Sequence, residues 1–365
     1  SLLASVGPKA DAWSGGHARA TLSVRYREPK MLRALRAAFF VVLFAACATA
    51  PDTARTDRAD IDVVTEDIAR FWIAYDAIRA EPDRDQHLSL LNALYLDVGS
   101  PGLHAMNRAR SYRSGEYLTA MRDYRRYLDA VRGNTLRVES FKQDIASGMR
   151  EMRALYPGDR SVPVYFVIGA FRASGTANDG KMLIGAELAM ADRTVPTDEL
   201  AETLPHLVDF VAGQPIDNVV ALTLHEYVHA QQRAISGNDL LSQTLFEGVA
   251  EYLSTAAIGR RSKADAIAYG EANRSAVLAA FAQDIGKTDF SGWIWNTPDN
   301  AFGMRDLGYY VGYVLADAYI MQADDRGTAI RELIELDYQD RAAVAAVVDA
   351  TCVFPQPVAA YTAER

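Results

Sequence analysis

The chain has few cysteines and no excess of basic residues. Cys47 and Cys352 are its only cysteines, too few for a disulfide scaffold or a cysteine-rich zinc cluster. It has 38 lysines and arginines and 47 aspartates and glutamates, which gives a formal net charge of -9. The sequence shows no stripe of basic residues that could bind a phosphate backbone. Nucleic acid is therefore not expected as a partner, and histidine and carboxylate side chains must hold any metal ion.

Long hydrophobic runs are also missing. The apolar run at residues 37–46 has about half of the roughly 20 residues that a membrane-spanning helix needs. Over the whole chain 50% of the residues are hydrophobic and 23% are charged, which is typical of a globular protein. This composition excludes a disordered chain and a polytopic membrane protein, and it allows one large domain or two ordinary ones.

The first 46 residues have the features of a leader. Residues 1–30 are rich in glycine, alanine, serine and arginine, show no periodicity, and are interpreted as an upstream extension. From Met31 onward, a basic segment with Arg33 and Arg36 precedes the short apolar run and a few small residues. This order is typical of a secretory signal peptide, which we place at residues 31–46.

The end of this leader, LFAAC at residues 43–47, resembles a bacterial lipobox. The resemblance implies that Cys47 is lipidated and becomes the N-terminus, with residues 47–60 as a polar tether. Because Ala48 follows the cysteine, it also implies an outer-membrane lipoprotein that faces the periplasm. The alternative is an ordinary signal peptide cut near residues 48–50 and a soluble periplasmic or secreted protein.

Removal of the leader makes the protein more acidic. Residues 1–46 hold seven basic and two acidic side chains, so the remaining 319 residues carry 31 basic and 45 acidic ones, a net charge of -14. Attachment to a membrane would therefore depend on the lipid at Cys47 and not on a basic surface.

The rest of the chain predicts an α+β fold that is mostly helical. Apolar residues recur at helical spacing over residues 61–80, and further helices are expected at 86–96, 116–131 and 136–155. We interpret residues 61–155 as an N-terminal helical region. The arginines of this region are expected on its solvated faces, paired with nearby acids.

A change to extended structure is predicted after residues 156–158, YPG. The segments 162–171 (VPVYFVIGAF) and 181–190 (KMLIGAELAM) are apolar and β-branched, and the turn-rich stretch 173–180 lies between them. We expect these two segments to pair as a hairpin or small sheet. Helices are expected from there to the end, so residues 156–355 form the second predicted domain.

A histidine and carboxylate motif, HEYVH, occupies residues 225–229. On a helix, His225 and His229 lie on one face one turn apart, so both imidazoles can bind one ion while Glu226 lies beside its open position. Capping residues before the motif and a glycine turn after it predict such a helix. With six histidines in the chain, this spacing arises by chance on the order of once in a hundred.

A third ligand is expected on a second helix downstream. A hydrolytic zinc site uses three protein ligands and leaves one position for water, whereas a structural site uses four. The segment FEGVAEY at residues 246–252 lies on a helix predicted over residues 240–258. Glu247 follows His229 by 18 residues, which lets a second helix return past the ion. Glu251 lies one turn further along the same face.

An HExxH motif followed by glutamate in an E-G-x-A-E context resembles the gluzincin metallopeptidases, which include thermolysin-like and aminopeptidase-N-like enzymes. The resemblance covers roughly residues 155–325. This part of the chain is also similar to bacterial lipoproteins described as zinc-dependent proteases. It implies a gluzincin core with a small β-sheet, an activity of zinc-dependent peptide-bond hydrolysis, and a peptide or protein as substrate.

The resemblance also assigns residues. It implies that His225, His229 and Glu247 bind one zinc ion per chain. It also implies that Glu251 accepts a hydrogen bond from the second ring nitrogen of a zinc-binding histidine and so orients it. Phe246 stands where these families usually have asparagine, and the interval to Glu247 differs by one residue.

The chemistry of such a site gives Glu226 the role of general base. It would take the proton of the attacking water and pass it to the leaving amine. A second donor is needed for the negative charge on the carbonyl oxygen. The segment GYYVGY at residues 308–313 resembles the catalytic tyrosine segment of aminopeptidase-N-like enzymes, which favours Tyr309, with Tyr310 and Tyr313 as alternatives; each could instead pack in the core.

Two further positions have open interpretations. Glu187 loosely resembles the exopeptidase glutamate that anchors a substrate amine, and the alternative is a solvent-facing strand residue. Cys352 is expected to be a buried thiol among apolar neighbours, and the alternative, if Cys47 is not lipidated, is a disulfide with Cys47. For the whole protein, the alternative to a peptidase is a non-catalytic binding or assembly lipoprotein that retains a gluzincin fold and its zinc site.

Overall fold

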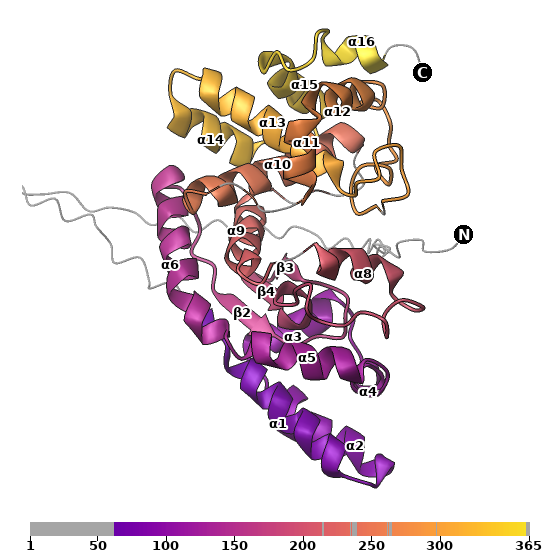
Figure 1. Ribbon diagram of the computed structural model, residues 1–365. Coiled ribbons are helices and arrows are strands. Elements are labelled where there is room, and N and C mark those ends of the chain that lie inside the picture. The colour runs from indigo at the N-terminus through magenta and orange to yellow at the C-terminus, as the bar shows by residue number, and fades with distance from the viewer. Residues whose placement is uncertain are drawn as a thin grey trace, which may run out of the picture. The chain divides into compact units, whose positions relative to one another are not determined.

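In the part of the chain that the structure describes, helices predominate and one small sheet lies among them (Figure 1). The computed structural model describes residues 62–362 except residues 214, 234, 236–238, 261, 263, 264 and 297. The predicted α+β fold, with helix predominating, is confirmed for this part of the chain. The predicted extension, signal peptide, lipidated Cys47 and tether lie outside the described residues.

The N-terminal region is helical, as expected. Its elements are α1 (Glu66–Ala80), α2 (Arg84–Leu91), the π-helical η1 (Asn92–Leu96), α3 (Pro101–Ala109), α4 (Ser114–Asp123), α5 (Arg125–Thr135) and α6 (Val138–Leu155). The helix expected over 116–131 is broken at Tyr124 into α4 and α5. Helix α3 was not expected; Ser100 caps it by accepting from the amides of Gly102 and Leu103, and Pro101 follows in the first turn.

The sheet has four strands in the order β1-β2-β4-β3: β1 (Val63–Val64), β2 (Val164–Val167), β3 (Gly175–Asn178) and β4 (Lys181–Gly185). The segments 162–171 and 181–190 pair within a small sheet, as expected, but β2 and β4 are parallel, so the hairpin alternative is wrong. Strand β3 forms within the stretch expected to be a turn, and it makes the hairpin with β4. Asp179 and Gly180 join them with φ of 50° and 65°, the two-residue turn that Asp-Gly favours.

One edge of this sheet, strand β3, has no further strand beside it in the described part of the chain. The amide of Gly185 on β4 donates to the carbonyl of Ser174 at 3.0 Å, just before β3 begins. Hydrogen bonding alternates along an antiparallel pair, so Gly175 and Ala177 direct their backbone groups away from β4. The outer edge of β3 therefore presents backbone donors and acceptors.

The C-terminal part is again helical. It comprises α7 (Ala186–Ala189), α8 (Pro205–Ala212), α9 (Asn218–Gln231), α10 (Leu240–Ala257), α11 (Asp265–Ala272), α12 (Arg274–Ala282), α13 (Leu307–Gln322), α14 (Arg326–Glu335), α15 (Arg341–Ala350) and α16 (Val358–Thr362). Helix α9 packs against β3 and β4 on one side and against α10 on another, so it lies between the sheet and the C-terminal helices (Figure 1). The helices predicted for the HEYVH and FEGVAEY segments are both present.

Helices α10 and α13 approach each other until their backbones touch. A Cβ atom on Gly248 of α10 would overlap the backbone of Gly312, and one on Gly312 of α13 would overlap the carbonyl oxygen of Thr244. Only glycine allows this approach. The contact brings Glu247, next to Gly248, and Tyr309, one turn before Gly312, to the same part of the molecule.

The N-terminal helices and the rest of the fold share one packing unit. Strand β1 pairs with β2, and α6 packs against both α9 and α10, so the chain continues past residue 155 without a break in packing.

Cys352 is exposed, with φ of 52°, and the expectation of a buried thiol is wrong. Within residues 62–362, as far as they are described, no helix combines the length and the apolar character needed to span a bilayer.

Candidate metal centre

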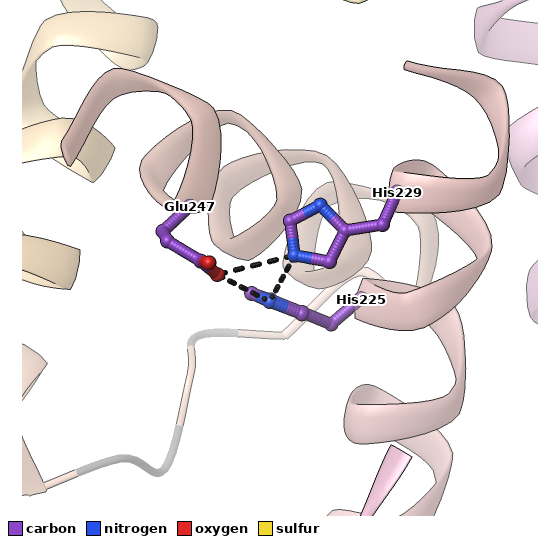
Figure 2. A group of neighbouring side chains, drawn as sticks. All are labelled: His225, His229 and Glu247. Atoms are coloured by element: carbon purple, nitrogen blue, oxygen red, sulfur yellow. Dashed lines mark hydrogen bonds and ion pairs between the residues drawn. The ribbon is translucent and has the colours of Figure 1, made fainter. Parts of the chain in front are cut away.

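Three side chains from α9 and α10 converge on one point (Figure 2). The Nε2 atoms of His225 and His229 are 3.0 Å apart, and Oε2 of Glu247 lies 3.2 Å from the first and 3.1 Å from the second. His225 and Glu247 are buried, being 9% and 4% exposed. The spacing expected from the sequence, i and i+4 on α9 plus a glutamate from the next helix, thus brings the three residues together.

A side chain outside the group of three contacts the Nδ1 atom of each imidazole. Oε2 of Glu251 lies 3.3 Å from Nδ1 of His225, and Oε1 of Gln232 lies 2.7 Å from Nδ1 of His229. The amide nitrogen of Gln232 donates to the carbonyl of Phe246 and the hydroxyl of Tyr338, so its oxygen is left to accept. Both imidazoles therefore donate through Nδ1, and in their neutral forms both Nε2 lone pairs face the centre.

The buried group stabilises positive charge at its centre. Burial lowers the pKa of His225, but hydrogen bonds and charges of Glu247 and Glu251 outweigh it and raise this pKa to about 10. Burial raises the pKa of Glu247, but the charge of His229 and hydrogen bonds with both imidazoles hold it well below its ordinary value. Gln243 donates to the other oxygen of Glu247 at 3.0 Å and fixes the carboxylate.

These donors fit a metal ion. Two imidazole nitrogens and one carboxylate oxygen, all within 4.8 Å of one another, present lone pairs to the same point, and a cation there removes their mutual repulsion. Among the residues that the structure describes, no other group of three histidine, cysteine, aspartate or glutamate side chains has this arrangement. The Phe246 ring stacks on His229 with centroids 4.4 Å apart, so it packs against a ligand where related motifs have asparagine.

Glu226 lies on the side of α9 that meets the sheet. A Cβ atom on Gly175 would lie 2.6 Å from Oε1 of Glu226, so a larger residue at this point of β3 would displace the glutamate side chain. Glu226 is partly exposed, in contrast to its neighbour His225. The carboxylate of Glu226, the residue that follows His225, therefore lies against the edge strand.

Of the three tyrosines considered, the structure brings Tyr309 to the site. Its ring centroid lies 5.9 Å from that of His225, and its hydroxyl accepts a hydrogen bond from Nε1 of Trp295 at 3.0 Å. Burial raises its pKa well above the ordinary value, and the charges of Glu247 and Glu226 raise it further. Tyr309 is therefore a protonated phenol close to both carboxylates.

The other two tyrosines face different helices. The hydroxyl of Tyr310 lies 3.2 Å from Oε2 of Glu271 on α11, and the Tyr313 ring packs against that of Tyr252 at 5.4 Å. Successive positions on a helix point about 100° apart, so only one of the adjacent tyrosines can face α9. Tyr310, expected as a catalytic residue, is directed away from the site.

Glu187 is neither a solvent-facing strand residue nor open to a substrate. It lies in α7, directly after β4, and is completely buried. Its carboxyl group accepts from the backbone amides of Gly169 and Phe171 at 2.9 and 3.2 Å, so it fixes the loop between β2 and β3. Burial raises its pKa to about 7, and these amide hydrogen bonds oppose the rise. An amine-anchoring role has no support in this geometry.

Two glutamines at the site were not expected from the sequence. Gln232 follows His229 by three residues, and Gln243 precedes Glu247 by four, so both lie one turn from a ligand. The helical spacing was available as a signal, although glutamine at such a distance is common on any helix.

We compared the chain with models of protein families, with curated proteins and with solved structures, and none of the three comparisons gave a match. The resemblance to gluzincins therefore rests on the motif residues of the sequence and stays a prediction.

Proposed function

We propose that this protein is a zinc-dependent metallopeptidase of the gluzincin type. The observation that carries the proposal is the convergence of His225, His229 and Glu247, whose ligand atoms lie 3.0 to 3.2 Å apart. A tetrahedral zinc ion with bonds of about 2.0–2.1 Å has its ligand atoms about 3.3 Å apart, close to this spacing. Three protein ligands leave one position for water, as hydrolysis requires.

The residues around this point have the chemical types that peptide hydrolysis needs. A bound zinc ion would supply a water molecule whose pKa is lowered from about 15.7 towards about 7. Glu226 accepts the proton of the attacking water and passes it to the leaving nitrogen. The hydroxyl of Tyr309 donates to the oxygen of the carbonyl under attack as that oxygen becomes negative.

The edge strand supports a peptide as the substrate. Ala177 directs its backbone amide and carbonyl away from β4, and Gly175, two residues earlier, contacts Glu226. An extended peptide can add to such an edge through main-chain hydrogen bonds. The peptide would then run past the general base. Arg110, which donates to the Gly175 carbonyl at 3.3 Å, would lie beside it.

The test is to measure bound metal and peptide cleavage on the same purified sample. We expect about one zinc ion per chain, measured by elemental analysis, and cleavage of a diverse peptide library that stops with a chelator and returns with zinc. A zinc-loaded protein that cleaves no peptide in the library would overturn the proposal and favour the non-catalytic binding or assembly lipoprotein.

We further propose that a lipid on Cys47 anchors the protein to the outer membrane, with the catalytic part facing the periplasm. Support comes from the lipobox-like sequence at residues 43–47. In a bacterial host, the wild-type protein should incorporate labelled fatty acid and sediment with membranes, and Cys47→Ser should do neither. Equal sedimentation of both proteins would contradict the anchor, and a soluble periplasmic or secreted protein would remain.

A further inference from the structure

The search beyond the proposed catalytic residues leads to Trp295, in the loop between α12 and α13. Its side chain is 57% exposed, and its backbone is in the left-handed region with φ of 54°. Tryptophan rarely adopts this conformation, which costs on the order of 1–3 kcal/mol and is found most often at functional sites. An exposed indole on a strained backbone gains little from packing, so another role is indicated.

The loop holds Trp295 in a defined place. Its ring packs edge-to-face against Phe290, with centroids 5.5 Å apart. The side chain of Asn296, the next residue, accepts from the amide of Asp306 at 2.7 Å, and the amide of Gly308 donates to the carbonyl of Trp293 at 2.9 Å. These bonds join the loop to the start of α13, the helix that carries Tyr309.

The hydrogen bond between Trp295 and Tyr309 can have only one direction. Nε1 of Trp295 lies 3.0 Å from the Tyr309 hydroxyl, and an indole N–H only donates. The tyrosine oxygen is therefore the acceptor, and its own hydrogen must point elsewhere. An ordinary phenol, with a pKa of about 10, keeps this hydrogen at neutral pH. In the described part of the chain, the Tyr309 hydroxyl has no second hydrogen-bond partner.

We propose that Trp295 is a positioning residue that holds Tyr309 with its hydroxyl hydrogen free for the substrate carbonyl oxygen. By filling one lone pair of the phenol from the solvent side, the indole limits rotation of the O–H bond and leaves it directed into the site. Trp295 does not touch the reacting atoms itself. This role rests on the proposed peptidase function, because it needs a carbonyl that becomes negative.

The first experiment compares Trp295→Phe with Trp293→Phe in the zinc-loaded protein. Trp293 lies in the same loop, but its indole donates to Asp284 at 2.9 Å, away from the candidate metal centre. We expect Trp295→Phe to lower kcat about tenfold, the effect of losing one neutral hydrogen bond, with KM and zinc content unchanged. Trp293→Phe should leave kcat per folded molecule unchanged. A raised KM at constant kcat for Trp295→Phe would instead make Trp295 a substrate contact.

A double-mutant cycle separates positioning from a general structural effect. In a Tyr309→Phe background, which has no hydroxyl to orient, Trp295→Phe should change kcat by less than about twofold. If it again costs about tenfold there, Trp295 acts independently of Tyr309 and the proposal fails.

The third measurement does not depend on activity. The chain has four tryptophans, so indole N–H signals in a proton–nitrogen correlation spectrum are few and can be assigned from the two tryptophan variants. Tyr309→Phe should move the Trp295 signal upfield and speed its exchange with water, while the Trp293 signal stays in place. An unmoved Trp295 signal overturns the hydrogen bond. A moved signal in a zinc-loaded protein that cleaves nothing overturns the peptidase function, and the catalytic role of Trp295 with it.

Discussion

Glu226→Gln is expected to abolish peptide hydrolysis while the protein keeps its zinc. The change replaces the carboxylate that accepts the water's proton in the proposed mechanism, and general-base catalysis is worth about 10²- to 10⁴-fold in rate. We expect kcat to fall within this range. Glutamine has nearly the size of glutamate, so it fits the space beside Gly175. Cleavage of a fluorogenic peptide taken from the library, with zinc measured on the same sample, checks the prediction.

A matched control makes the same chemical change elsewhere. Glu271 on α11 is exposed and accepts from Tyr310, on the face of α13 that is directed away from the candidate metal centre. Glu271→Gln should leave kcat and zinc content unchanged. If Glu226→Gln keeps more than about a tenth of the wild-type kcat, a range that general-base loss does not allow, another residue must take the proton.

Glu247→Gln should remove most of the affinity for zinc, and with it the activity. The variant loses the only anionic ligand of the group and leaves two neutral imidazoles around the ion. Glu251 contacts His225 at Nδ1, at 3.3 Å, and not at the Nε2 atom that faces the centre, so we expect it to support a ligand and not to bind the ion itself. Loss of such an outer partner costs about 10- to 100-fold in affinity, and we expect Glu247→Gln to exceed this range.

Competition with a chelating dye measures both affinities under the same conditions. Glu251→Gln is the control, because it removes a partly buried carboxylate one turn away on the same helix. Its zinc affinity should lie between those of the wild-type protein and Glu247→Gln. The reverse order would show that the roles of Glu247 and Glu251 have been exchanged.

The core of the site could be predicted because its geometry is local. His225 and His229 are one turn apart on any helix, and their convergence needs no knowledge of the rest of the fold. Glu247 required one more assumption, that the next helix returns past the first, and α10 does so. The sequence therefore predicted correctly that His225, His229 and Glu247 lie close together, because this needs only helical spacing and one returning helix.

The tyrosines could not be distinguished from the sequence. Tyr309, Tyr310 and Tyr313 all lie on one apolar helix, whose composition is too uniform to show which face meets which neighbour. The rotation of α13 about its own axis decides which tyrosine faces α9. This rotation depends on the backbone contact of Gly248 with Gly312, which links residues 64 positions apart. Trp295 could not be recognised for the same reason, since its partner is fixed only when the loop closes onto α13.

The small sheet was predicted, but the parallel direction of its two apolar strands was not, because apolar content does not decide strand direction. The segments 162–171 and 181–190 are both apolar and do lie side by side, but in parallel. The signal that was available was Asp179-Gly180, a hairpin turn that requires a strand on each side of it. Glu187 was assigned to a strand because the apolar run continues past Gly185, whereas the chain turns into α7 there.

The contact between Gly248 and Gly312 gives the site a fixed minimum width. The backbones of α10 and α13 already touch, so no substitution at either position can bring Glu247 and Tyr309 closer together. A larger side chain can only push the helices apart. In the proposed peptidase, substitutions at this contact can therefore only widen the space between these two residues.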